Sequence, residues 1–122
     1  DNTAIVSAIL DTKDHDSALL ALVTGTNTDT NATFAVVLEE SNDSGMAGAA
    51  AVNDVDLVGT EALAGFTAAD DDNKCRKLGY IGSMRYSRAT MTTSGNDSGN
   101  IFLAGVWVLG HPAVAPTANP PQ

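Results

Sequence analysis

Cysteine and aromatic side chains are scarce in this chain of 122 residues. Cys75 is the only cysteine, so the chain can form neither an internal disulfide nor a thiolate zinc site of the usual kind. Aromatic residues make up 5% of the chain, while hydrophobic residues make up 43%, and much of that share is Ala and Val. We therefore expect a thin core, which two sheets faced with small, β-branched side chains would form better than bulky helices.

Basic residues are also few. Six Lys and Arg stand against 15 Asp and Glu, which gives a formal net charge of -9. Since a phosphate backbone would be repelled at long range, we expect no nucleic-acid partner. Five of the six bases lie within residues 74–88, whereas acids dominate residues 1–72. This asymmetry suits docking onto a neighbouring protein, and it equally suits a surface that only keeps the molecule in solution.

Long apolar runs are missing too. None approaches the ~20 residues that a membrane-spanning helix needs, and the polar first residues are unlike a signal peptide, so we expect no membrane partner. The length suits a single domain with one core. We assign residues 1–112 to that domain and residues 113–122 to an extended C-terminal arm or tail.

Apolar runs of moderate length recur between clusters of Gly, Asn, Asp, Ser and Thr, a pattern typical of all-β proteins. We expect a two-sheet antiparallel sandwich, jelly-roll-like, with about eight strands. The expected strands are residues 4–10, 17–24, 33–40, 50–58 (the weakest), 65–67, 77–81, 84–93 and 101–109. One short helical turn is expected near Glu61.

Alternation along the strands predicts which side chains face the core. Phe34, Val36 and Leu38 share one face of residues 33–40, and we expect them to point inward. Residues 101–109 are apolar on both faces, which indicates either a central strand covered on both sides or an oligomer contact.

Two polar segments have turn chemistry. Residues 94–99 read SGNDSG and offer several residues that accept positive φ, so we expect residues 84–93 and 101–109 to form an antiparallel hairpin. Residues 25–31 have similar chemistry and should link the second and third strands.

The last ten residues read AVAPTANPPQ. Proline fixes φ and removes an N–H donor, so this segment should run extended rather than join a sheet. It is either a disordered tail or an arm that orders on a neighbour, and for the isolated chain we favour the tail.

Catalytic and metal-binding patterns are weak. His15 and His111 are the only histidines, and no nucleophile elbow accompanies them, so we do not expect an enzyme. Acidic clusters at residues 11–16 and 70–73 could collect a hard cation, but neither matches an EF-hand loop. We expect solvated loops there, with no metal and no cofactor.

The remaining polar group combines arginine and tyrosine, which are enriched in protein interfaces. Arg85 and Arg88 could anchor a partner, or they could form ion pairs within the chain while the tyrosines join the core; the two interpretations are evenly balanced. The residues that we assign to a protein interface are Arg85, Arg88, Tyr80, Tyr86, His111, Pro112, Pro116 and Pro120.

Several short motifs follow one another in the chain. Residues 85–88 read RYSR, a polar turn follows, and an apolar strand then ends in LGHP at residues 109–112. Upstream, a strand ends at Gly25, a polar loop follows, and residues 34–43 read FAVVLEESND. In these motifs the chain resembles the small all-β capsid decoration, or cement, proteins of tailed bacteriophages.

The resemblance implies a virion structural protein that binds and stabilises the outer capsid surface through contacts with the major capsid protein. It implies a homo-oligomer, with a trimer favoured, and no catalytic residues. The chain departs from the family at Ala89, where a β-branched residue is usual, and in the extra segment 113–122. Alternatives are a head-to-tail connector, a tail protein, or a carbohydrate-binding sandwich with Trp107, Tyr80 and Tyr86 as stacking platforms.

Overall fold

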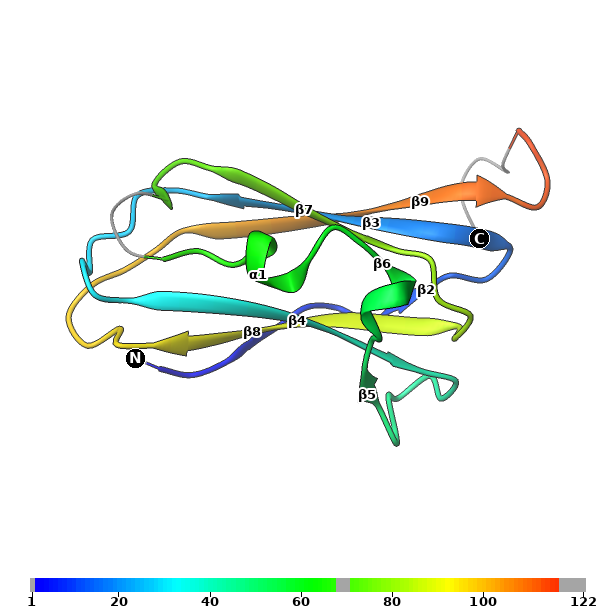
Figure 1. The fold of residues 1–122 in the computed structure, drawn as a ribbon, viewed down its shortest axis with the longest axis horizontal. Helices are drawn as coiled ribbons and strands as arrows, with labels where there is room; N and C mark the ends of the chain where they lie inside the picture. The colour runs from blue at the N-terminus through cyan, green and yellow to red at the C-terminus, as the bar shows by residue number, and fades with distance from the viewer. Residues whose placement is uncertain (1, 68–70, 117–122) are drawn as a thin grey trace.

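The computed structural model describes residues 2–67 and 71–116 as two antiparallel sheets stacked in two layers (Figure 1). Sheet A holds β1 (Ile5–Val6), β2 (Leu10–Asp11), β4 (Thr33–Ser41), β5 (Ala50–Ala51) and β8 (Tyr86–Ser94). Sheet B holds β3 (His15–Thr24), β6 (Leu57–Val58), β7 (Cys75–Tyr80) and β9 (Leu103–Pro112). The expected all-β fold with two antiparallel sheets is therefore confirmed.

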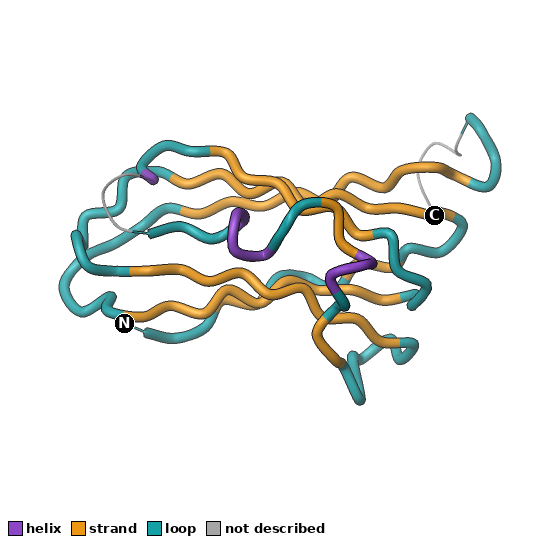
Figure 2. Tube along the Cα trace, viewed as in Figure 1, coloured by secondary structure: helices purple, strands orange, loops and turns teal. Residues whose placement is uncertain are grey.

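The strand order shows where the chain changes layer. Sheet A runs β1-β8-β4-β5, with β2 also on β8, and sheet B runs β6-β7-β3-β9. Residues 25–31 link β3 to β4, as expected, but they do so by crossing from sheet B to sheet A. Most loops gather at the two ends of the sandwich (Figure 2).

The predicted hairpin between residues 84–93 and 101–109 is wrong. β8 pairs with β4, β1 and β2, whereas β9 pairs with β3 in the other sheet. Turn residues such as Gly and Asn allow the chain to reverse, but they do not decide whether the second strand pairs with the first or with the opposite layer. Here the chain crosses to the other layer, and the two strands pack against the same core from opposite sides.

The loop that makes this crossing is held by a buried carboxylate. Asp29, in the β3–β4 loop, accepts hydrogen bonds from the backbone N–H groups of Asp97 and Ser98, each at 2.9 Å. A third donor is the N–H of Asn31, at 3.3 Å. These donors, that of Ser98 first, lower the pKa of Asp29. The two crossing loops are thus tied together at one end of the sandwich.

We expect Asp29→Ala to loosen that end, because two backbone donors lose their acceptor. Amide exchange at Asp97 and Ser98 should speed up by roughly tenfold or more, since local opening sets the exchange rate of such groups. Hydrogen exchange followed by NMR checks this, with amides of the β3–β7 ladder as the internal reference. Unchanged exchange at both positions would contradict the assigned role of Asp29.

The core lies between the layers and is mostly aliphatic. Phe34, Val36 and Leu38 of β4 are fully buried, so the predicted inward face is confirmed. Leu20 and Leu22 of β3 oppose them from sheet B. The other core residues are Ala18, Ala32, Val52, Leu57, Ala64, Phe66, Leu78, Tyr80, Ala89 and Met91.

Segments with weaker patterns form short elements. Residues 50–58 contain β5, the 3₁₀ turn η1 (Asp54–Asp56) and β6 rather than one strand. Phe66 makes only an isolated bridge to Phe34, with mutual backbone bonds of 2.7 and 2.8 Å. The helical turn near Glu61 is confirmed as α1 (Glu61–Ala64).

α1 lies beside the sandwich, where it contacts β4 and β7 (Figure 1). The Thr60 side chain caps it by accepting from the N–H of Leu63 at 3.2 Å. The Glu61 carboxylate accepts from the N–H of Leu38 at 2.7 Å, so it joins the turn to sheet A. Across the described ranges, no helix is long and apolar enough to span a membrane.

Candidate interaction surfaces

Arg85 pairs with an acid within the chain. Its guanidinium donates to both carboxylate oxygens of Asp11, at 2.8 and 2.9 Å, and lies 5.1 Å from the ring centroid of Tyr86. The hydrogen bond from Arg85 lowers the pKa of Asp11. Both side chains of the pair are nearly half exposed, so the pair lies at the surface.

Arg88 forms a second ion pair on the outer side of sheet A. It sits directly opposite Glu39 in the β4–β8 ladder and donates to its carboxylate at 2.8 Å. The Thr90 hydroxyl donates to the same oxygen at 2.7 Å. Arg88 and then Thr90 lower the pKa of Glu39. Both arginines thus have partners within the chain, as one of the two sequence-based interpretations proposed.

These lowered pKa values predict a loss of stability in acid. The pKa of Glu39 is lower in the folded protein than the value of about 4.3 in an unfolded chain. The stabilisation is therefore fully present above that value and is lost as the pH falls through the folded pKa. We expect the urea midpoint of the unaltered chain to fall as the pH is lowered from roughly 5 to 3, the range in which carboxylates titrate. The midpoint of Glu39→Gln should fall less over the same range.

Asp54→Asn is the matched control, because Asp54 is exposed and has no ion pair within the described residues. Its acid response should match that of the unaltered chain. An equal response of Glu39→Gln and the unaltered chain would show that the Arg88 pair contributes nothing to the pH dependence.

The two tyrosines have different environments. Tyr80 is 1% exposed, and its hydroxyl donates to Glu40 Oε2 at 2.7 Å, so a sheet B residue is joined to a sheet A residue. Burial, followed by the contact with Glu40, raises the pKa of Tyr80. Tyr86 is half buried beside Arg85 on sheet A. The predicted group of two arginines and two tyrosines is therefore not one surface, because Tyr80 lies inside.

The predicted C-terminal residues lie at the far end of β9. His111 Nδ1 is 2.8 Å from the Ser17 hydroxyl, and Pro112 is opposite His15 in the ladder. No described carboxylate hydrogen-bonds to the His111 ring. Pro116 is exposed. Pro120 lies outside the described residues.

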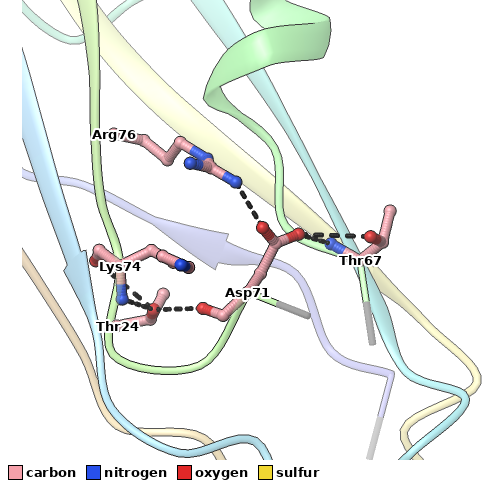
Figure 3. Close-up of polar contacts among 5 residues, drawn as sticks. All are labelled: Thr24, Thr67, Asp71, Lys74 and Arg76. Atoms are coloured by element: carbon pink, nitrogen blue, oxygen red, sulfur yellow. Dashed lines mark hydrogen bonds and ion pairs between the residues drawn. The ribbon is translucent and has the colours of Figure 1, made fainter. Parts of the chain in front are cut away.

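The second acidic cluster is occupied by donors from the chain itself. Asp71 accepts from the guanidinium of Arg76 and from the N–H and hydroxyl of Thr67, at 2.7 and 3.1 Å (Figure 3). Thr24 accepts from the N–H of Lys74 at 3.2 Å and donates to the backbone oxygen of Asp71 at 3.0 Å. Asp70 lies outside the described residues. Within the part of the chain that the structure describes, no three acids, histidines or cysteines are grouped to hold a metal.

An open cleft of about 720 Å³ lies beside this cluster, between α1 and β4. Its floor includes Phe66, and the Arg76 guanidinium lies 5.6 Å from the centroid of that ring. Among the described residues, the charged groups that line it are Glu61, Asp71 and Arg76. Each of these three has a hydrogen-bond partner within the chain.

The most unusual surface is the outer side of sheet B. Leu20 and Leu22 point into the core, so Leu19, Ala21 and Val23 point outward. The ladder places apolar residues of β9 beside them. We call this surface the sheet B face; it consists of Leu19, Ala21, Val23, Val58, Cys75, Lys77, Ala104, Val106 and Val108.

The sheet B face is exposed and almost without charge. Val23, Val58, Val106 and Val108 are 52%, 58%, 58% and 50% exposed. Lys77 is its only charged residue. No described helix or loop covers it (Figure 1). Contiguous apolar surface of this kind usually marks a contact with another molecule.

The outer side of sheet A is different. Its central ladder pairs Glu39 with Arg88, and hydroxyl-bearing residues lie on the same side together with Val6, Ala35 and Val37. The exposed or half-buried hydroxyl-bearing residues on this side are Thr33, Tyr86, Thr90, Thr92 and Ser94. The outer side of sheet A thus carries charged and hydroxyl groups, whereas the sheet B face carries mostly exposed apolar side chains.

Among the described strands, β9 lies at the edge of sheet B, so the interpretation of residues 101–109 as a central strand is wrong. The alternative, an oligomer contact, stays a prediction. The apolar character of β9 was visible in the sequence, but the apolar row that it forms with Leu19, Ala21 and Val23 depends on which strand pairs with it. That row was therefore missed.

Comparisons with known proteins give no relative. No protein-family model matches this chain, and no curated protein or solved structure is significantly similar to it.

Proposed function

We propose that the chain is a structural protein of a bacteriophage virion that docks on the outer surface of the capsid and stabilises it, as a decoration or cement protein does. The observation that carries the proposal is the exposed apolar sheet B face, together with the motif resemblance. The partner is the major capsid protein. Burying this face removes apolar surface from water, which favours association at about 25 cal/mol per Å² before the costs of binding.

The thin core supports the same role. Its side chains are mainly Ala, Val and Leu, and no disulfide can form with one cysteine. A protein that binds a partner only in its folded state is stabilised by that binding. A decoration protein would gain part of its stability from the capsid, and the capsid would gain additional contacts between its subunits.

The finer architecture that we propose is jelly-roll-like. The antiparallel pairs β3/β9, β4/β8 and β6/β7 are nested in the sequence and alternate between the sheets. A long hairpin rolled into a sandwich has this arrangement. The N–H of Ala113 donates to the Asp14 carbonyl at 2.8 Å where the predicted C-terminal arm or tail begins, and residues 117–122 of that segment lie outside the described residues.

The proposed assembly is a homo-oligomer on the capsid lattice. A head-to-tail connector or a tail protein is the second candidate, because an apolar face could equally bind within a ring. A carbohydrate-binding role is disfavoured, since Tyr80 is buried and Trp107 packs against the core.

The test is to add the purified chain to capsids of its own phage assembled without it. We expect saturable co-sedimentation, and electron microscopy should show density at regular positions outside the shell with the sheet B face toward it. Absence of binding, or density only at the portal or tail, would overturn the capsid-surface proposal.

A further inference from the structure

β9 is a long strand with one free edge. Within the described residues its only neighbour is β3. The N–H of Gly25 donates to the carbonyl of Phe102 at 2.7 Å, just before the strand begins. Backbone groups of an antiparallel ladder alternate between its two sides. The polar backbone groups of Leu103, Gly105 and Trp107 therefore point to the free edge.

This edge lacks the features that normally prevent strand pairing. Natural edge strands are kept short, or they carry charges, proline or bulges. The other edge strands here, β1, β2, β5 and β6, have two residues each, while β9 has ten. Residues 98–122 contain no Asp, Glu, Lys or Arg, and the first proline is Pro112 at the end of β9.

An apolar hollow lies directly behind this edge. It has a volume of about 240 Å³ and opens between the two sheets. Its sheet A side includes Ile5 and Met91, and its sheet B side includes Gly105 and Trp107. The indole Nε1 of Trp107 is buried without a hydrogen-bond partner among the described residues. The free edge of β9 and the apolar hollow behind it therefore form one open side of the sandwich.

We propose that two copies of the chain pair through their β9 strands, antiparallel, about a two-fold axis at Val106. In this register Val106 faces Val106, Ala104 faces Val108, and Gly105 faces Trp107. Gly105 of one copy leaves room for the Trp107 indole of the other. The two-fold axis repeats this contact, so it occurs twice. Each copy thereby closes the open edge of the other.

Charge distribution favours a second copy as the occupant. Each chain has a net charge of -9, so two copies repel each other over most of their surfaces. β9 belongs to the one long stretch without formal charge, where that repulsion is weakest. The pair also makes the two sheet B faces continuous. The pairing rests on the self-association in the proposed function and assigns it a two-fold axis, where the resemblance implies a trimer. It does not depend on the capsid.

Cysteine cross-linking tests the register in the full chain with Cys75→Ser. Val106→Cys should form a disulfide-linked dimer under mild oxidation, because facing residues in a non-hydrogen-bonded antiparallel pair have Cα atoms about 4.5 Å apart, within disulfide reach. Ala104→Cys is the matched control on the same strand face. In the proposed register the two substituted positions lie four residues apart along the strands, roughly 14 Å, so this variant should stay unlinked.

Sedimentation equilibrium of the unaltered chain should give a dimer, and Val106→Lys should weaken it by about tenfold or more because like charges would face each other. Val23→Lys, one strand in from the edge, should leave the dimer intact. A monomer or a trimer in sedimentation, or cross-linking at position 104 but not 106, would overturn the pairing. A Val106→Cys dimer that fails to bind capsids would contradict only the capsid proposal.

Discussion

Truncating Tyr80 to alanine is expected to lower the free energy of unfolding by about 4 kcal/mol, as large-to-small changes of buried aromatic residues do. Tyr80 is 1% exposed and is among the largest fully buried side chains of the chain. Alanine would leave a cavity between the sheets and would remove the hydroxyl that contacts Glu40. Urea denaturation followed by circular dichroism measures the change.

Tyr80→Phe separates the hydroxyl from the ring. The hydroxyl contacts Glu40 Oε2 at 2.7 Å and accepts from the N–H of Met84 at 3.2 Å. Glu40 is 6% exposed, so the phenylalanine variant leaves a buried carboxylate without its donor. We expect a loss of about 1 to 3 kcal/mol, the usual cost of an unsatisfied buried polar group.

Tyr86→Ala is the matched control, because Tyr86 is half buried on the outer side of sheet A. It should cost about 1 kcal/mol or less, as surface substitutions usually do. If Tyr80→Phe is as stable as the unaltered chain, the Tyr80–Glu40 contact does not stabilise the sandwich. If Tyr86→Ala costs as much as Tyr80→Ala, the assignment of the two environments is wrong.

Local patterns in the sequence predicted the longer strands and the inward face of residues 33–40. Alternation in residues 33–40 places Phe34, Val36 and Leu38 inside without any knowledge of the partner strand. The helical turn at Glu61 also depends on nearby residues, since Thr60 supplies its cap. Features of this kind are set over a few residues, so one sequence is enough to predict them.

Pairing between distant segments could not be predicted in the same way. Arg88 meets Glu39 only because β8 and β4 lie side by side in one register. The loop at residues 95–102 crosses between layers, although its glycine and asparagine residues suit a hairpin equally well. The sheet B face likewise combines strands that are far apart in the chain. Each of these features depends on the topology, which is a property of the whole core.

Val23→Lys is expected to weaken capsid binding about 100-fold or more. Val23 lies on the sheet B face, is 52% exposed, and has Ala104 and Cys75 opposite it in the neighbouring strands. A lysine there would place an ammonium group against the capsid. The ammonium group would lose its bound water without gaining a partner for its charge. A cost of about 3 kcal/mol corresponds to this change in affinity.

Thr92→Lys is the control for charge, because it makes the same change in net charge on the exposed outer side of sheet A. Both variants should keep the urea midpoint of the unaltered chain, since neither side chain is in the core. Quantitative co-sedimentation with capsids should then show full binding for Thr92→Lys and loss for Val23→Lys. Equal loss in both would assign the effect to net charge, and full binding by Val23→Lys would exclude the sheet B face as the docking surface.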